Sequence, residues 1–266
     1  MFKFSRVRTI IDKEWAEVFK NRVVLFTIIL MPLIFTLLPL GVLFFFGNNA
    51  AMQGGDSADV PAQFAMSCGN LPMKDCVQIF MVNEFMLLYL MMPIMIPITI
   101  AAYGIVGEKT THSLEPLLAT PVTTEELLAG KGLSAVIPAV VATWGCFLIF
   151  LLAVPLTGVS KEVLAYIAGP TWLLAIFLVG PLMAVMAVNF AIFISSRTAD
   201  PRVAEQISAV LVMPVMLLLF GQIAGFIILN VQLVLITAIV LVAVDLAMVR
   251  LAARLFRRET ILTAWK

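Results

Sequence analysis

The chain has 266 residues, of which 62% are hydrophobic and only 12% are charged, so it is far more apolar than soluble globular proteins. Its formal net charge is +1, and no strongly basic region indicates binding to nucleic acid. One His and three Cys provide too few ligands for a His-rich metal site or a cysteine cluster. The composition therefore predicts a membrane protein with no nucleic acid partner and no metal site.

Residues 1–22 have a helical pattern, with apolar residues on one side and charged residues on the other. The apolar side is formed by Val7, Ile10, Ile11, Trp15, Val18 and Phe19. This pattern predicts an amphipathic helix that lies on the inner surface of the membrane. Two roles fit it equally well: a simple anchor for the first span, and a helix that transmits force.

Six stretches are long and apolar enough to cross a membrane, since a spanning helix needs ~20 mostly apolar residues. The expected fold is therefore an all-α membrane protein with six transmembrane helices in residues 23–251. The first stretch follows a polar lead of 22 residues and is too long for a cleaved signal peptide, so we expect it to remain as a span. The six stretches are 23–47, 80–106, 133–155, 164–194, 206–229 and 231–251.

Fifteen of the 17 Lys and Arg residues fall on alternate polar segments, and this asymmetry predicts the orientation of the chain. Both termini, including the tail at 252–266, are expected in the cytoplasm with the loops at 107–132 and 195–205. Residues 48–79 are expected to form an outer loop. The connection at Asn230 is either a tight turn between two spans or part of a re-entrant pair.

Polar side chains are rare within the predicted spans, and three of them are candidates for a translocation path. Glu84 lies near the outer end of the second span, and Asp245 lies about one turn inside the inner end of the sixth. Ionisable groups inside a membrane are functional candidates by default, although groups near an interface are often solvated or paired with a cation such as Arg250. Asn189, deeper in the fourth span, fits either a hydrogen bond between helices or a contact with substrate.

Two of the three cysteines, Cys68 and Cys76, lie eight positions apart in the predicted outer loop, whereas Cys146 lies within the third span. The compartment outside a cell membrane is usually oxidising, and a short loop rich in Gly, Asn and Pro gains order when it is closed. We therefore expect a disulfide between Cys68 and Cys76.

The sequence lacks the motifs of three classes of intramembrane protease. The single histidine, His112, lies in a cytoplasmic loop, which excludes a His-Glu-x-x-His zinc site and a serine–histidine pair inside the bilayer. An aspartyl protease needs two intramembrane aspartates, and only Asp245 qualifies. No G-x-x-x-x-G-K-[ST] motif is present either, so we expect no catalytic residue and no cofactor on this chain.

The loop at 107–132 begins with the signals of a short helix. Ser113 can cap the first turn, and Pro121 ends the helix because it forces the preceding residue into an extended conformation. The apolar face of this helix is formed by Leu114, Leu117 and Leu118. An apolar stripe outside the membrane needs a partner or the membrane surface to cover it.

Two further helix starts are predicted on the cytoplasmic side. Thr123 and Glu126 have the spacing of a capping box, which opens a second short helix that we expect to end at Gly130. Asp200 followed by Pro201 is typical of a helix start in the next cytoplasmic loop. The loop after the second span is therefore expected to contain ordered helices and not to be a flexible linker.

This loop also resembles a known family. A Glu-Lys pair at 108–109, the run at 113–122 and the run at 125–131 look like the signature of ABC-2 type transporter permeases, with His-Ser at 112–113 where Gly-Thr is usual. Residues 195–206 are similar to the second cytoplasmic loop of that family. Six spans with inside termini and an N-terminal amphipathic helix fit the family over nearly the whole chain.

The resemblance implies a type V ABC exporter, in which two permeases, identical or paralogous, pair within the lipid of the inner (plasma) membrane. Two separate ATPase subunits would hold ATP-Mg and drive them. It also implies a coupling helix at 113–120, which enters a groove of the ATPase, and a connecting helix at 6–20 beside it. The residues assigned to ATPase coupling in this way are Glu108, Ser113, Leu114, Glu115, Leu117 and Leu118.

A nearly uncharged bundle rich in Phe and Met favours hydrophobic or amphipathic cargo, such as a drug, a peptide or a lipid. The alternatives are a sodium-exporting ABC permease, an ion-gradient-driven carrier or channel, and a membrane anchor for a signalling ATPase. A gradient-driven carrier is expected to have buried charges or an internal repeat, and the sequence contains no convincing repeat.

Overall fold

The computed structural model describes residues 3–20, 22–48, 61–69, 71–110, 123–198 and 200–255. All regular secondary structure within these ranges is helical. The elements are α1 (Phe4–Val18), α2 (Arg22–Asn48), α3 (Ala62–Ser67), α4 (Met73–Tyr89), α5 (Met92–Thr110), α7 (Thr124–Ala153), η2 (Val154–Thr157), α8 (Lys161–Ile167), α9 (Pro170–Leu174), η3 (Ala175–Val179), α10 (Gly180–Arg197), α11 (Pro201–Ser208), η4 (Ala209–Val212), α12 (Met213–Ile223) and α13 (Val231–Leu255).

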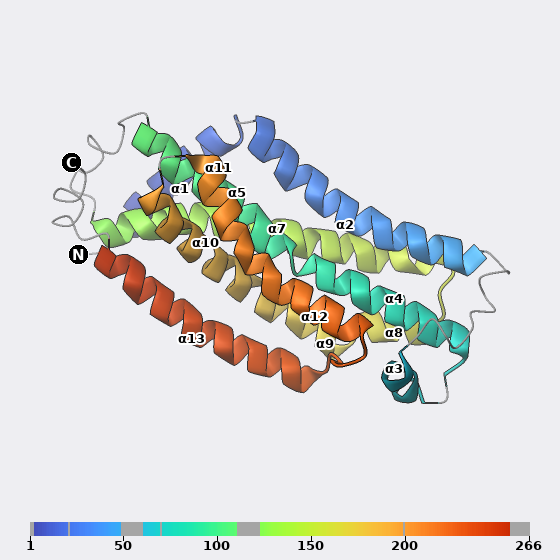
Figure 1. The fold of residues 1–266 in the computed structure, drawn as a ribbon. Coiled ribbons are helices and arrows are strands. Elements are labelled where there is room, and N and C mark those ends of the chain that lie inside the picture. The colour runs from blue at the N-terminus through green and yellow to red at the C-terminus, as the bar shows by residue number, and fades with distance from the viewer. Residues whose placement is uncertain are drawn as a thin grey trace.

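Six candidate membrane spans are present within the described residues, which confirms the predicted number. The long helices lie side by side along a single bundle axis (Figure 1). One end of the bundle holds α1, α11 and the last turns of α13, and we call it the α1 end; the opposite end holds α3 and is called the α3 end (Figure 1). The six spans are Val24–Phe45, Met73–Gly104, Glu125–Thr157, Lys161–Ser195, Pro201–Ile223 and Val231–Leu251.

The second span forms the centre of the bundle. In its most apolar window 78% of the residues are buried, against 22% for α2, 17% for α11–α12 and 22% for α13. An aromatic cluster supports this centre, because the ring of Tyr89 packs against Phe147 and Phe150 from α7. The Tyr89 hydroxyl donates a hydrogen bond of 3.0 Å to Thr36 of α2, so this buried polar group is satisfied.

Helices extend beyond two of the predicted boundaries. Helix α4 already begins at Met73, inside the range 48–79 that the sequence predicts as an outer loop, and α3 also lies in that range. The helix that opens at Thr124 does not end at Gly130 but continues to Ala153. Glycine in a helix is often a stop signal, but here it has a packing role that the next section describes.

The connection that contains Asn230 joins two antiparallel helices, α12 and α13 (Figure 1). Gly225 has a φ of 75°, a left-handed conformation that favours glycine. The Asn230 side chain then accepts a hydrogen bond of 2.8 Å from the backbone N–H of Leu233 and caps the start of α13. This arrangement fits the tight turn and not the re-entrant pair.

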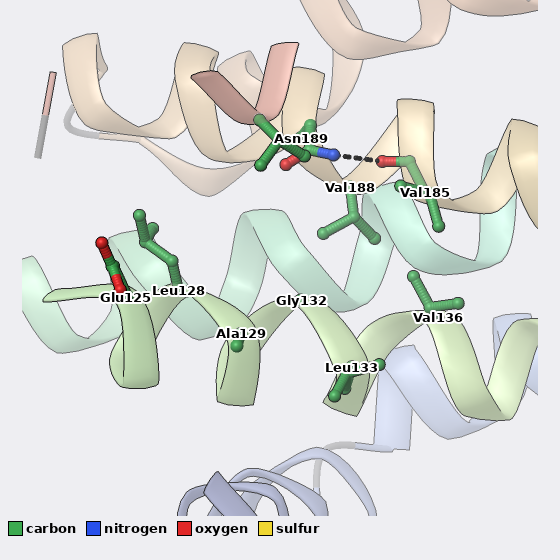
Figure 2. A pocket seen from close by; sticks show the side chains of 10 residues that line it. Glu125, Leu128, Ala129, Gly132, Leu133, Val136, Val185, Val188 and Asn189 are labelled. Atoms are coloured by element: carbon green, nitrogen blue, oxygen red, sulfur yellow. Dashed lines mark hydrogen bonds between the residues drawn. The ribbon is translucent and has the colours of Figure 1, made fainter. Parts of the chain in front are cut away.

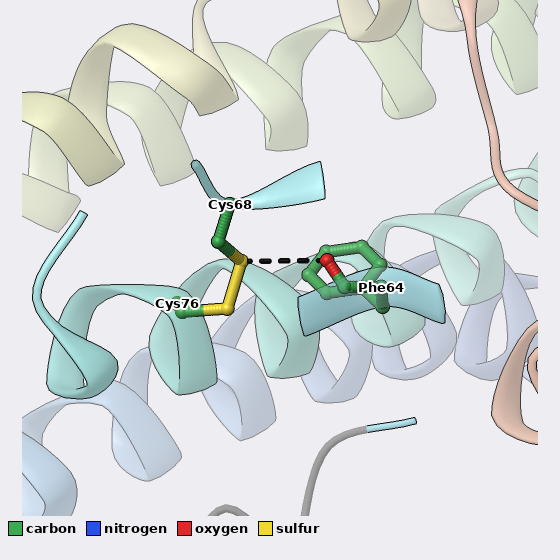
Figure 3. The surroundings of a disulfide bond; sticks show 3 residues. All are labelled: Phe64, Cys68 and Cys76. Atoms are coloured by element: carbon green, nitrogen blue, oxygen red, sulfur yellow. Dashed lines mark hydrogen bonds between the residues drawn. A yellow bond between two sulfur atoms is a disulfide. The ribbon is translucent and has the colours of Figure 1, made fainter. Parts of the chain in front are cut away.

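A disulfide between Cys68 and Cys76 ties α3 to the first turn of α4 (Figure 3). This is the pair that the sequence singles out. The ring of Phe64 on α3 packs against Phe80 on α4 with 5.1 Å between ring centroids, so the two helices also share an apolar contact. The α3 end is therefore held by a covalent bond and aromatic packing.

Candidate functional site

A buried ion pair fastens α1 to α7 at the α1 end of the bundle. Lys131 Nζ of α7 lies 2.8 Å from Glu14 Oε1 of α1, and their side chains are only 7% and 4% exposed. Lys131 Nζ also lies 3.4 Å from the carbonyl oxygen of Gly104 in α5. Because desolvated charges are stable only with close partners, this contact fixes the positions of three helices relative to one another.

Two glycines allow α1 to lie this close. A Cβ at Gly104 would come within 2.9 Å of Glu14 Oε2, and a Cβ at Gly130 would come within 2.7 Å of Ile10 Cγ2. Real Cβ atoms almost never approach other atoms so closely. Gly130 therefore has a packing role: it leaves room on α7 for the docked α1.

A second set of contacts lies at the first turn of α7. Thr123 and Glu126 form the predicted capping box, with both of its hydrogen bonds present. The Glu126 carboxylate also accepts a hydrogen bond of 2.7 Å from the backbone N–H of Lys3 and one of 3.2 Å from Arg6. A single buried carboxylate thus caps α7 and holds the start of α1 against it.

These contacts lie on the two helices that precede and follow, in the sequence, the segment predicted to couple the chain to an ATPase. We define the α1 junction as Glu14, Gly104, Gly130, Lys131 and Ser134, the residues that dock α1 onto α5 and α7. Helix α5 ends at Thr110 and α7 begins at Thr124, so both helices that flank residues 111–122 are fastened to α1. Any displacement of that segment would act on three helices that are joined to one another.

A separate cavity of about 300 Å³ lies between α7, α10 and α13 near the α1 end. Figure 2 shows the side chains of α7 and α10 facing each other across it. Asn189 lines the cavity and donates a hydrogen bond of 3.0 Å from Nδ2 to the carbonyl oxygen of Val185. The residues that line it are Glu125, Leu128, Ala129, Gly132, Leu133, Val136, Val185, Val188, Asn189 and Val249.

The comparison with protein families agrees with this architecture. The model of the family described as ABC-2 family transporter protein matches residues 8–239. The chain belongs to the ABC-2 transporter family. It is therefore a multi-pass membrane permease of an ABC transporter. A search of curated proteins found no match.

The predicted coupling residues of this ABC-2 permease fall mostly outside the described residues. Glu108 lies in the last turns of α5, where only the backbone is described. Ser113, Leu114, Glu115, Leu117 and Leu118 lie within 111–122, outside the described residues. The coupling helix at 113–120 therefore stays a prediction.

The predicted connecting helix of the permease coincides with α1. Trp15 donates a hydrogen bond of 3.0 Å from Nε1 to the carbonyl oxygen of Ser134 in α7. Ile11 is half-buried, whereas Phe19 is 49% exposed and follows the end of α1. Three residues of the predicted apolar side, Val7, Ile10 and Val18, are buried, and Glu14, which was not predicted, is buried with them.

Glu14 and Lys131 were missed by the sequence reasoning, yet the sequence carries a signal for Glu14. It shares one helical face with Ile10 and Val18, and a carboxylate on an apolar face requires a buried partner. The identity of that partner cannot be read from the sequence, because Lys131 lies 117 positions away.

The three candidates for a translocation path do not come together in one place. Asn189 lines the cavity between α7, α10 and α13, whereas Glu84 and Asp245 are not among its lining residues. Both carboxylate oxygens of Glu84 and of Asp245 are buried and have no hydrogen-bond partner among the described residues. Glu84 lies on α4 and Asp245 on α13, so they belong to different parts of the permease.

Proposed function

We propose that this ABC-2 permease is the membrane-spanning half of an ATP-driven exporter. Separate ATPase subunits would supply the energy, and a second copy or a paralogue would complete the transport path. The observation that carries the proposal is the α1 junction, which fastens both helices flanking residues 111–122 to α1. A segment pushed by an ATPase at this point would move α5 and α7 together.

In this proposal the residues at 113–120 form the helix that enters the ATPase, and α1 is the connecting helix beside it. Glu115 would lie near the positive N-terminal end of that helix, where a carboxylate is favoured, and could pair with a basic residue of the ATPase. Leu114, Leu117 and Leu118 would fill an apolar groove of the partner.

The proposed location is the inner (plasma) membrane, with both termini in the cytoplasm. Two observations support this orientation. Fifteen of the 17 Lys and Arg fall on the segments assigned to the cytoplasm. The α1 helix and the last turns of α13 lie at the same end of the bundle (Figure 1).

Pairing with a second permease is supported by the apolar surfaces of the outer helices. Phe26 of α2, Leu217 of α12 and Ile239 of α13 are 62%, 65% and 70% exposed. Lipid covers such surfaces in a membrane, and a second permease can cover part of them. Hydrophobic or amphipathic cargo is consistent with the same nearly uncharged bundle.

The coupling proposal can be tested by the double substitution Leu117→Asp with Leu118→Asp. Each buried leucine contributes ~1.5 to 3 kcal/mol, so the pair should lower association with the ATPase by more than about a hundredfold. The control is Lys161→Asp, which places a carboxylate at an exposed charged position at the start of α8, near the opposite end of the bundle (Figure 1). Co-purification and vesicle transport at wild-type levels in the double variant would overturn the assignment.

The proposal also requires that the chain hydrolyses no ATP by itself, since its sequence has no phosphate-binding loop. ATPase activity should appear only when a separate cassette subunit is added. Vanadate-sensitive hydrolysis in a preparation proven free of other chains would contradict the proposal.

One observation favours a second candidate, an ion-gradient-driven carrier. Glu84 and Asp245 carry buried carboxylates without hydrogen-bond partners among the described residues, and such groups inside a membrane often belong to ion pathways. The two functions differ in their energy source. Substrate uptake into vesicles that hold a sodium or proton gradient, but no ATPase and no ATP, would support the carrier.

A further inference from the structure

The cavity between α7, α10 and α13 has the size and the lining of a ligand site. Its volume of about 300 Å³ is at the lower end of the range for small-molecule sites, ~300 to 1,000 Å³. Apolar side chains form most of its wall, with Asn189 and Glu125 as the polar exceptions. Such a surface binds an apolar body and leaves few polar groups to orient it.

Each polar side chain of the cavity carries an acceptor oxygen. Asn189 Nδ2 donates one of its two hydrogens to the carbonyl oxygen of Val185, so its amide oxygen and one N–H remain for an occupant. Glu125 is exposed and lies at the first turn of α7, next to the α1 end. Among the described lining residues Glu125 is the only ionisable one, and its charge is negative.

A second carboxylate, Asp245, is not part of the lining but lies one helical turn along α13 from a residue that is. Val249 of α13 lines the cavity, and Asp245 precedes it by four residues, so both lie on the same face of α13 about one turn apart. Asp245 is 6% exposed, and neither of its oxygens has a hydrogen-bond partner among the described residues. A buried carboxylate without a partner is costly, and a cationic occupant would offset that cost.

We infer that this cavity binds an amphipathic organic cation, which enters from the inner leaflet with its apolar body between α7 and α10. Its ammonium group would lie near the carboxylate of Asp245, and Glu125 would add negative charge at the part of the cavity next to the α1 end. The inference deepens the proposed function, because it names the charge of the cargo and a place where the cargo first contacts the chain.

The test is equilibrium binding of radiolabelled decyltrimethylammonium to the full chain in nanodiscs, without any ATPase and with empty nanodiscs as background. Decyl sulfate, which has the same alkyl chain but the opposite charge, is the matched ligand. We expect saturable binding of the cation and none of the anion. Equal binding of both would overturn the inference. Because no ATPase is present, failure here would leave the exporter proposal standing.

Two variants and two controls locate the site. Asp245→Asn, which keeps the shape of the side chain, should weaken cation binding by about tenfold. The control Glu84→Gln removes the other buried carboxylate without a partner, which lies on α4, a helix that contributes no residue to the lining, and it should leave binding unchanged. Wild-type affinity in Asp245→Asn, or an equal loss in Glu84→Gln, would overturn the assignment.

Gly132→Leu should fill the cavity and abolish saturable binding. Gly132→Ala is its control, because a Cβ there lies 3.7 Å from Val188, an ordinary contact. Circular dichroism and elution volume check that Gly132→Leu folds. If this variant does not fold, the affinity of Asp245→Asn for the cation decides whether the cavity is the binding site. A phospholipid could instead co-purify with the wild type and be lost in Gly132→Leu. If decyltrimethylammonium does not displace that phospholipid, the cavity is a lipid site and the inference is overturned.

Discussion

The two ends of the bundle are held together by different kinds of interaction. At the α1 end, α1, α5 and α7 meet through the buried Glu14–Lys131 ion pair and through hydrogen bonds. At the α3 end, a disulfide from Cys68 to Cys76 joins α3 to α4. Noncovalent contacts can exchange partners as helices shift, whereas a covalent bond cannot. In the proposed exporter, movement would be transmitted at the α1 end and restricted at the α3 end.

Removing the ion pair should have the largest effect. Lys131→Met leaves the Glu14 carboxylate buried without its closest partner, which should lower the stability of the bundle by ~3 kcal/mol. The thermal unfolding midpoint of the detergent-purified protein measures this loss. Lys13→Met is the matched control, because Lys13 contacts the same Glu14 oxygen at 3.4 Å but is 39% exposed, so its loss should cost less than about 1 kcal/mol. Equal midpoints for the two variants would show that the buried pair has no special role.

Removing the disulfide should have a somewhat smaller and more local effect. Replacing both Cys68 and Cys76 by Ser releases a loop whose ends are eight positions apart, which should cost ~2.5 kcal/mol on the chain-entropy estimate. The change should appear as faster proteolysis near α3, with vesicle transport retained. Cys146→Ser is the control, since that cysteine is free. Labelling of both outer cysteines in non-reduced wild-type protein would contradict the disulfide itself.

A third substitution tests how closely α1 must approach α7. Gly130→Ala places a Cβ 2.7 Å from Ile10 Cγ2, and the resulting displacement of α1 should cost ~2 kcal/mol. Gly132→Ala, two positions along the same helix, should not destabilise the protein, because its nearest contact is 3.7 Å away. Adding Ile10→Ala to Gly130→Ala should restore part of the lost stability. If Gly130→Ala unfolds at the wild-type temperature, the close approach is not needed.

The smallest expected effect is at the capping box. Thr123→Ala removes the side-chain oxygen that accepts from the Glu126 N–H and should cost ~1 kcal/mol. Thr123→Ser keeps that oxygen and should behave like the wild type. Hydrogen exchange at the first turn of α7 resolves the difference, and equal protection in both variants would argue against a stabilising cap.

The predictable parts of the fold are those that depend on local signals. Six long apolar stretches, the capping box at Thr123 and the helix start at Asp200 are all present in the structure. The capping box and the Asp200 helix start each depend on residues within four positions of one another. The start of α4 at Met73 was not predicted, because polar residues such as Lys74 and Asp75 interrupt the apolar pattern there although the helix has already begun.

The parts that could not be predicted depend on contacts between distant residues. Gly130 has the local signature of a helix end, and only the position of Ile10 reveals that it makes room for α1. The Glu14–Lys131 pair likewise joins positions 117 apart. The residues that line the cavity come from three helices, α7, α10 and α13, so no single segment of the sequence shows that they lie together.

The close approach at Gly104 and Gly130 also limits how the chain can change during evolution. A larger residue at 130 is tolerated only if residue 10 becomes smaller, whereas a larger residue at 104 requires the carboxylate of Glu14 to move. Helix α1 is therefore not an interchangeable module. A chimaera that receives α1 from a distant relative should fold poorly unless the facing stretches of α5 and α7 are exchanged with it.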